Sequence, residues 1–261
     1  MRSDSDVPTD AAIAVRGLEV GYGALIVQRH LDFEVERGTI FIIMGGSGCG
    51  KSSVLRVLIG LLPPLGGEVL LGGVSLWHVD GAERDRLTRR FGVLYQRGAL
   101  WSAMTLAENV GLPLAQFTGL TASQRREVAA LKLAFVGLAG FEDYYPAQLS
   151  GGMQKRAGLA RAMALDPEIL FLDEPTAGLD PVSSRRFDDL ILELRESFGG
   201  TVVVVTHELA SIFAIGDDAV FLDAEAQTMI ARGHPKTLLD QSTDPKVRAF
   251  LTRGEPAVKA R

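Results

Sequence analysis

The stretch "TIFIIMGGSGCGKS", residues 39–52, decides the fold. Its first half is a short apolar run rich in β-branched residues, which is typical of a strand buried on both faces. Its second half follows the pattern glycine, four residues, glycine, lysine, serine. Glycines at this spacing let the backbone wrap around a diphosphate, with N–H groups pointing inward at the start of a helix. The expected phosphate-binding residues are Gly45, Gly46, Ser47, Gly48, Cys49, Gly50, Lys51, Ser52 and Ser53.

Two residues of this loop have more specific expected roles. Lys51 adds a positive charge for the β- and γ-phosphates, and Ser52 offers an oxygen to a magnesium ion. Cys49 lies inside the loop, where the pattern gives little support for a redox sensor. We expect its thiol to be exposed near a helix N-terminus and therefore open to alkylation.

The composition of the chain narrows its class. The 261 residues carry a net charge of -5, which argues against nucleic acid as the main partner. The arginines at 84, 86, 89 and 90 alternate with acidic residues, as on a solvated helix face. One cysteine permits no intrachain disulfide, and the polar start "MRSDSDVPTD" lacks the apolar core of a signal peptide. No apolar run has the length of a membrane span, so we expect a soluble, cytoplasmic protein.

Buried strands alternate with helical patterns along the chain. "ILFLD" (169–173) and "TVVVVTH" (201–207) resemble the first buried strand, and a helical pattern follows each. This alternation predicts an α/β fold with a mostly parallel core sheet and helices on both faces. Residues 12–22 and 31–38 alternate apolar and polar side chains, as half-buried strands do.

The remaining segments predict a helical insertion and two loose ends. Residues about 97–165 have a mainly helical pattern, in which Thr121 and Gln124 form a capping box. A C-terminal helical extension is expected at about 234–253. Residues 1–10 are expected to be disordered and residues 256–261 to form a frayed tail, which leaves a single domain at 11–255.

Two adjacent acids stand at the end of the strand expected at 169–173. Asp173 ends it, where a carboxylate can reach the magnesium ion through its water shell. Glu174 comes next and could orient or deprotonate an attacking water. The alternative is an ordinary solvated turn, which the phosphate loop upstream disfavours.

Further motifs give a family resemblance. "LSGGMQKR" (149–156) resembles the signature motif of the ATP-binding cassette (ABC) ATPases, and "AGLDP" (177–181) resembles their D-loop. Gln96 stands in the position of their Q-loop glutamine, His207 in that of their switch histidine, and Tyr22 in that of the aromatic residue that stacks on adenine. The resemblance covers essentially the whole chain, and the motifs occur in the family's order.

The resemblance implies a mechanism with two chains. ATP and Mg²⁺ are the expected ligands, and the fold should add an antiparallel β subdomain and an inserted helical subdomain to the core. Glu174, His207 and Gln96 are the implied catalytic residues, and Ser52, Gln96 and Asp173 the implied metal ligands. Ser150, Gly151 and Gly152 open a helix whose N-terminus would meet the γ-phosphate bound by a partner chain, with Asp180 at the dimer seam.

An unusual tryptophan follows Gln96. In transporters of this family, the surface beside the Q-loop receives a short helix of the membrane permease. Leu100, Trp101 and Met104 can form an apolar socket for such a helix, or can simply pack the helical subdomain against the core. Under either reading, Gln96 would couple this surface, residues 96–106, to the magnesium site.

The sequence of this segment indicates a subgroup of the ABC ATPases. "YQRGALWSAMTLAENVGLPL" (95–114) is similar to the corresponding segment of Mla-type ATPases, which serve lipid transporters with an MCE-domain protein. "DPKVRAFLTRG" (244–254) resembles their C-terminal helix, while Tyr95 and Trp101 replace the commoner phenylalanines. The implied protein is a homodimeric ATPase at the cytoplasmic face of a bacterial inner membrane. Its permease would move phospholipid to or from a periplasmic MCE-domain protein.

Several points stay open from the sequence. A transporter ATPase for another solute fits the same motifs, and so does a soluble ABC ATPase such as an iron–sulfur assembly factor. The lipid species, the transport direction and a small cytoplasmic regulatory subunit are not decided by the sequence.

Overall fold

The computed structural model describes residues 11–96 and 98–254. These residues form two compact units, residues 1–88 with 217–261 and residues 89–216, insofar as they are described. The expected disordered start at 1–10 and the expected tail at 256–261 lie outside the described residues. In the described ranges, none of the helices combines the length and the apolar character that crossing a bilayer requires.

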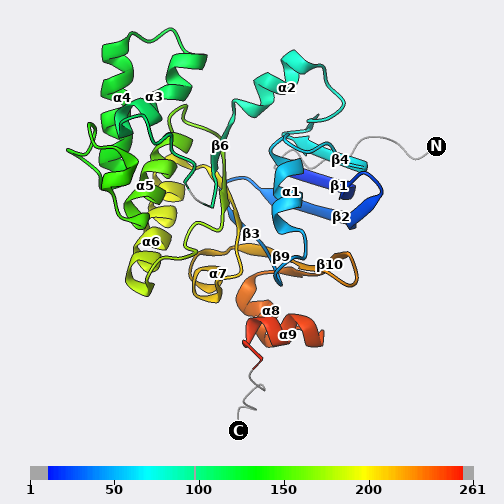
Figure 1. Cartoon of the computed structure of the whole chain (residues 1–261). Helices are drawn as coiled ribbons and strands as arrows, with labels where there is room; N and C mark the ends of the chain where they lie inside the picture. The colour runs from blue at the N-terminus through cyan, green and yellow to red at the C-terminus, as the bar shows by residue number, and fades with distance from the viewer. Residues whose placement is uncertain (1–10, 97, 255–261) are drawn as a thin grey trace. The chain divides into compact units, whose positions relative to one another are not determined.

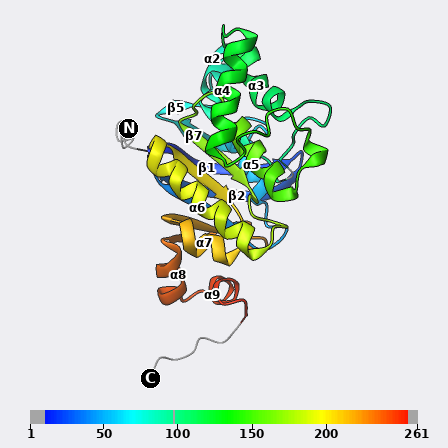
Figure 2. The same ribbon diagram turned by 90° about the vertical axis from the view of Figure 1, so that its left-hand side faces the viewer.

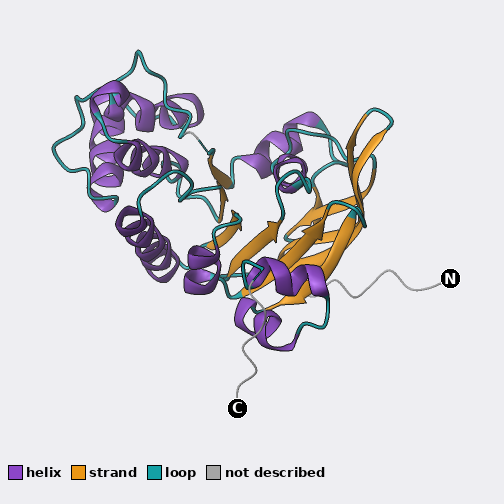
Figure 3. Ribbon diagram, turned by 60° about the horizontal axis from the view of Figure 1, so that its bottom comes forward, coloured by secondary structure: helices purple, strands orange, loops and turns teal. Residues whose placement is uncertain are grey.

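The first unit contains an antiparallel sheet and a set of strands around the phosphate loop. The antiparallel sheet has the order β2-β1-β4-β5, and Figure 3 shows its paired strands in orange. Its strands are β1 (Ala11–Tyr22), β2 (Leu25–Glu36), β4 (Gly66–Leu71) and β5 (Val74–Ser75). The first five residues of β1 are all buried, which departs from the expected alternation because no polar side chain occurs before Arg16.

The remaining strands of this unit carry the nucleotide motif. β3 (Ile40–Gly45) is buried throughout, as predicted, and pairs in parallel with β9 (Asp218–Asp223). β10 (Thr228–Gly233) runs antiparallel to β9. The helices are α1 (Lys51–Leu58), α2 (Gly81–Thr88), α8 (Pro235–Gln241) and α9 (Pro245–Leu251). Figure 1 shows α8 and α9 after β10, where the C-terminal helical extension is expected.

The second unit places three parallel strands beside a group of helices. β6 (Phe91–Leu94) pairs with β7 (Ile169–Asp173), which pairs with β8 (Thr201–Val205). The helices are α3 (Leu106–Phe117), α4 (Ala122–Phe135), η1 (Pro146–Gln148), α5 (Gly151–Ala162), α6 (Pro181–Phe198) and α7 (Leu209–Ile215). Figure 2 shows α6 and α7, which pack on each other. The predicted α/β class with parallel strands and an antiparallel sheet is confirmed.

The helical segment of this unit begins where the sequence indicates. Thr121 caps α4, its side chain accepts the N–H of Gln124, and Gln124 reaches back to the N-cap N–H, so the predicted capping box is confirmed. Helices α3, α4 and α5 lie within the expected range 97–165, but they share their unit with β6, β7 and β8. The expected boundaries of a separate helical subdomain therefore stay a prediction.

Candidate functional site

Two glycines of the loop between β3 and α1 combine a backbone conformation that side chains rarely adopt with too little room for a Cβ. Gly45 has φ 149, and a Cβ there would lie 2.4 Å from the carbonyl oxygen of Leu222. Gly50 has φ 97, and a Cβ there would lie 2.4 Å from a methyl group of Val27. Because Gly50 has no side chain to cap α1, the first N–H groups of that helix are available to an anionic ligand.

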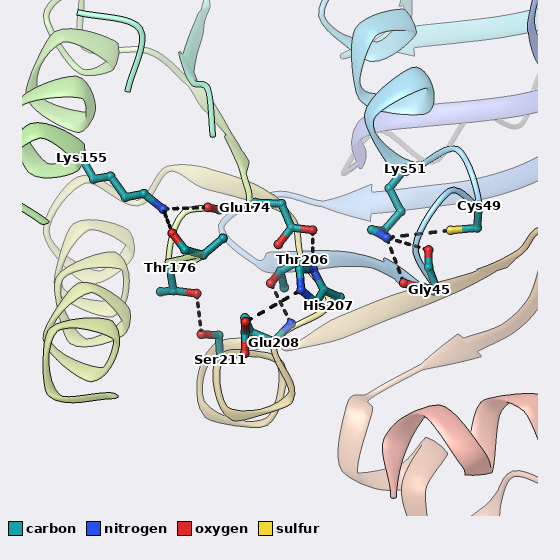
Figure 4. A network of polar contacts seen from close by, with 12 residues as sticks. Gly45, Cys49, Lys51, Lys155, Glu174, Thr176, Thr206, His207, Glu208 and Ser211 are labelled. Carbon is teal, nitrogen blue, oxygen red and sulfur yellow. Dashed lines mark hydrogen bonds and ion pairs between the residues drawn. The ribbon is translucent and has the colours of Figure 1, made fainter. Parts of the chain in front are cut away.

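The side chains at the start of α1 surround this loop. The Lys51 ammonium is buried and donates to the carbonyl oxygens of Gly45 at 2.9 Å and Gly46 at 3.0 Å (Figure 4). Ser52 is exposed, so its hydroxyl is open to a ligand. The Tyr22 hydroxyl lies 3.2 Å from the Ser53 hydroxyl, which lowers the pKa of Tyr22, and it accepts a hydrogen bond from Arg56. The ring expected to meet adenine therefore stands beside α1.

Cys49 differs from the expectation. Its side chain is only 2% exposed, because the thiol turns inward and a Cβ on Gly45 would lie 2.7 Å from its sulfur. Burial raises the pKa of the thiol, so the expectation of an exposed, alkylatable group is wrong. The Cys49 carbonyl accepts a hydrogen bond of 2.7 Å from buried Gln28, a loop contact that sequence reasoning missed.

Glu174 and His207 are brought together at the ends of neighbouring strands. Asp173 of β7 pairs with Val205 of β8, so the residues after both strands leave at the same edge. His207 Nδ1 lies 2.7 Å from Glu174 Oε1 (Figure 4). Glu174 Oε2 is buried and has no hydrogen-bond partner among the described residues. Since buried acceptors are normally satisfied, this oxygen is suited to a water or ligand group.

The backbone of Glu174 is strained and is held from one side by a lysine. Glu174 has φ 48, a left-handed conformation that costs a non-glycine residue about 1 kcal/mol or more. The Lys155 ammonium donates to the carbonyl oxygens of Glu174 at 3.1 Å and Ala177 at 2.6 Å. Lys155 lies in the quoted "LSGGMQKR" motif, yet its spacing gave no sign of this contact.

Gln96 follows β6, and Asp173 is the last residue of the adjacent strand β7. Leu94 at the end of β6 pairs with Leu172 of β7, so Gln96 and Asp173 emerge at one edge of the sheet. Gln96 is exposed two residues beyond β6. The loop residues 45–53 belong to the first unit and these residues to the second.

The signature segment opens α5 as expected. The Ser150 hydroxyl caps the helix and accepts the N–H of Met153, and Gly151 and Gly152 form its first turn. Asp180 caps α6 in the same way, and hydrogen bonds from Ser183 lower the pKa of its carboxyl group. A pocket of about 320 Å³ joins the two helix starts, lined among others by Ser150, Gly152, Arg156, Leu179, Ser183 and Arg186.

The loop after Gln96 is built around a buried asparagine. Asn109 of α3 is completely buried, and its amide oxygen accepts the N–H of Trp101 at 2.7 Å. Its amide nitrogen lies within hydrogen-bond distance of the carbonyl oxygens of Trp101, Met104 and Thr105. The Trp101 side chain is nevertheless 61% exposed. Packing against the core therefore does not explain Trp101, although Leu100 and Met104 are half-buried.

A buried carboxyl group in the second unit should make stability depend on pH. Asp188 is 2% exposed, and burial raises the pKa of its carboxyl group to about 6 although Ser211 donates to it. Because the pKa of Asp188 is higher in the folded than in the unfolded chain, protonation of this carboxyl group stabilises the fold. That contribution is fully present below the unfolded pKa and is lost as pH rises through about 6.

Asp188→Asn should reveal this linkage. Because asparagine does not ionise, the free energy of unfolding of the wild type should gain about 1 kcal/mol relative to the variant between about pH 7.5 and pH 5. Urea denaturation of both proteins at the two pH values measures the change. A difference between the proteins that is the same at both pH values would contradict the assigned pKa.

Comparison with known proteins agrees with this geometry. The sequence model of the family described as ABC transporter matches residues 28–177, more than half of the chain. The chain is 37% identical to the probable ribonucleotide transport ATP-binding protein mkl of Mycobacterium leprae, over 95% of this chain and 71% of that protein. It is also 37% identical to the intermembrane phospholipid transport system ATP-binding protein MlaF of Haemophilus influenzae, over 93% of this chain and 90% of that protein.

A solved structure shows the same fold. The dimeric post-hydrolysis state of the ATP-binding cassette MJ0796, bound to ADP and Pi, has a TM-score of 0.77 and 30% identity. The similarity covers 85% of this chain and 98% of that one. The chain therefore belongs to the ABC transporter family, as one of its ATP-hydrolysing cassettes.

Proposed function

We propose that this ATPase works as a homodimer that powers a phospholipid transporter at the cytoplasmic face of a bacterial inner membrane. Its permease would exchange lipid with a periplasmic MCE-domain protein. The observation that carries the proposal is the loop of Trp101–Thr105, an exposed tryptophan on a backbone fixed by buried Asn109. The relatives named MlaF support the choice of cargo.

The hydrolytic step is assigned to Glu174 and His207. Glu174 would accept a proton from the attacking water, for which its unpartnered Oε2 is available, while His207 holds Oε1 at 2.7 Å. Lys51 would neutralise the β- and γ-phosphates, with Tyr22 against the adenine.

A magnesium ion fits the oxygen donors available. Ser52, Gln96 and Asp173 supply hydroxyl, amide and carboxylate oxygens, the ligand types that Mg²⁺ takes in phosphoryl-transfer enzymes. When bound, the ion would offset negative charge on the phosphates. Ser52 and Gln96 are both exposed, so their donor atoms are open to such a ligand.

The second half of each nucleotide site is assigned to a partner chain. Ser150, Gly151 and Gly152 begin α5 and would offer their helix N-terminus to the γ-phosphate of the partner's nucleotide. Asp180 would lie at the seam. The solved cassette of similar fold, which is dimeric and bound to ADP and Pi, supports the homodimer.

The exposed loop is assigned to the permease. A tryptophan with 61% of its surface exposed is an unusual feature on a rigid loop, and such residues are enriched where protein interfaces form. Asn109 fixes the loop before any partner binds, which lowers the ordering cost of docking. A short amphipathic helix of the permease is the expected occupant.

The experiment that tests the cargo is purification of the assembled complex. A tagged chain is extracted from its native membranes in mild detergent, and the proteins and lipids that accompany it are identified by mass spectrometry. A permease with an MCE-domain protein and bound phospholipid supports the proposal. A permease with bound nucleotides or another solute, or a chain without membrane partners, refutes it.

A matched pair of variants tests the docking loop in the same experiment. Trp101→Ala should lower recovery of the permease at least about tenfold, because buried tryptophans are frequent hot spots of interfaces. Leu131→Ala removes an equally prominent apolar side chain, 69% exposed on α4, and should leave recovery unchanged. Equal recovery with both variants would place the permease contact elsewhere.

A further inference from the structure

Three buried polar side chains behind the Glu174–His207 pair have no assigned role. Thr176 follows Glu174 by two residues, Ser211 lies on α7 just after His207, and Asp188 lies on α6. Each is at most 2% exposed. They therefore connect the turn after Glu174 with α7, the helix that follows His207, and with α6.

The hydrogen bonds among them have a definite direction. The Ser211 hydroxyl donates to Asp188 Oδ2 at 2.9 Å. Since that donation uses its hydrogen, Ser211 must accept from the Thr176 hydroxyl, 3.2 Å away (Figure 4). The chain of bonds thus runs from Thr176 through Ser211 to a carboxylate that anchors its end.

This arrangement is costly as a purely structural element. A buried carboxylate and two hydroxyl groups lose their hydration, and Asp188 Oδ1 has no hydrogen-bond partner within the described ranges. Replacing buried charged groups by apolar residues of similar volume is often neutral or stabilising. A geometric role therefore accounts for the cluster better than a stabilising one.

The turn after Glu174 is the element that requires such a restraint. Its backbone is left-handed at Glu174, a conformation that persists only when its surroundings hold it. Lys155 holds the turn from α5 through the carbonyl oxygens of Glu174 and Ala177. Thr176 links the same turn to a second helix, α7, through its hydrogen bond with Ser211. Helix α7 begins two residues after His207.

We propose that Thr176, Ser211 and Asp188 are positioning residues for ATP hydrolysis. They hold the turn after Glu174 against the helix after His207, and so they fix the 2.7 Å contact between the two catalytic side chains. The assignment rests on the roles proposed above for Glu174 and His207. It adds a group of residues that touches neither nucleotide nor metal.

The test compares two substitutions at one position. Thr176→Ser keeps the hydroxyl, whereas Thr176→Val keeps the volume and loses it. With the full-length chain, phosphate release from radiolabelled ATP gives kcat and KM, and nucleotide-binding stoichiometry gives the folded fraction. Thr176→Val should lower kcat about tenfold with KM within about twofold of the wild type, and Thr176→Ser should restore most of the rate.

A second variant shows whether the residues act as one chain. Ser211→Ala should lower kcat as Thr176→Val does, and the double variant should be no slower than the slower single variant. Equal kcat values for the valine and serine variants at Thr176 would overturn the assignment. If the factor by which kcat falls in the double variant equals the product of the two single factors, the assignment is also overturned. Independent residues give that result, because their contributions to the activation free energy add.

Measurement of Glu174→Gln in the same series separates this inference from the proposed mechanism. A Glu174→Gln variant that still turns over ATP refutes the role of Glu174 itself, and the positioning assignment falls with it. An inactive Glu174→Gln together with a fully active Thr176→Val refutes only the assignment of the buried chain.

Discussion

Glu174→Gln should reduce the turnover of ATP by roughly two to three orders of magnitude while leaving nucleotide bound. Glutamine has nearly the shape of glutamate, so the turn held by Lys155 and the neighbourhood of His207 should survive. It cannot take the proton of the attacking water. Because binding and dimer closure come before that step, an ATP-bound dimer should accumulate.

Two measurements check this result. Single-turnover phosphate release gives the chemical rate, and light scattering with MgATP reports the dimer. Glu208→Gln is the matched control, because the half-buried Glu208 has a carboxylate oxygen 3.8 Å from the other nitrogen of His207. The control should retain most of the rate. A Glu174→Gln protein that stays monomeric with MgATP, or hydrolyses ATP as fast as the control, would assign the base elsewhere.

The local features of the fold were predictable because their causes lie within a few residues. The run at 39–44 is buried throughout as β3, and the glycines after it turn the chain where a Cβ would collide with Leu222 or Val27. The capping box at Thr121 involves only residues three apart. Hydrophobic pattern and glycine spacing encode such features directly.

The contacts between distant residues were not predictable, because they depend on strand register. The 2.7 Å approach of Glu174 and His207 follows from the pairing of Asp173 with Val205, and no pattern within either segment specifies that pairing. The inward turn of Cys49 likewise depends on the backbone of its whole loop.

One missed residue did leave a signal. Asn109 lies on the face of α3 that also buries Leu106 and Val110, and a polar residue on the buried face of a helix needs partners. That reasoning could have tied it to the loop before the helix. Lys155 left no such sign, since a lysine within a helix is usually solvated.

Removing the charge of Lys51 should nearly abolish nucleotide binding. Lys51→Met keeps most of the buried stem and loses the ammonium, which would otherwise bond to phosphate oxygens. Charge-assisted bonds of this kind contribute about 3 kcal/mol, so the dissociation constant for ATP should rise roughly a hundredfold. Calorimetric titration with MgATP measures it, and a change of only a few-fold would mean that the backbone N–H groups carry the binding.

The thermal stability of the same variant should not fall. In the protein without nucleotide, the Lys51 ammonium is buried with carbonyl oxygens of Gly45 and Gly46 as acceptors, and these carry no compensating charge. A buried cation without a counter-charge is costly, so the methionine variant should melt at the same temperature as the wild type or higher. If the variant binds ATP more weakly but is as stable as the wild type, the loss of binding is due to the missing ligand contact and not to a damaged fold. The wild type would then hold a charge whose natural partner is the phosphate of its substrate.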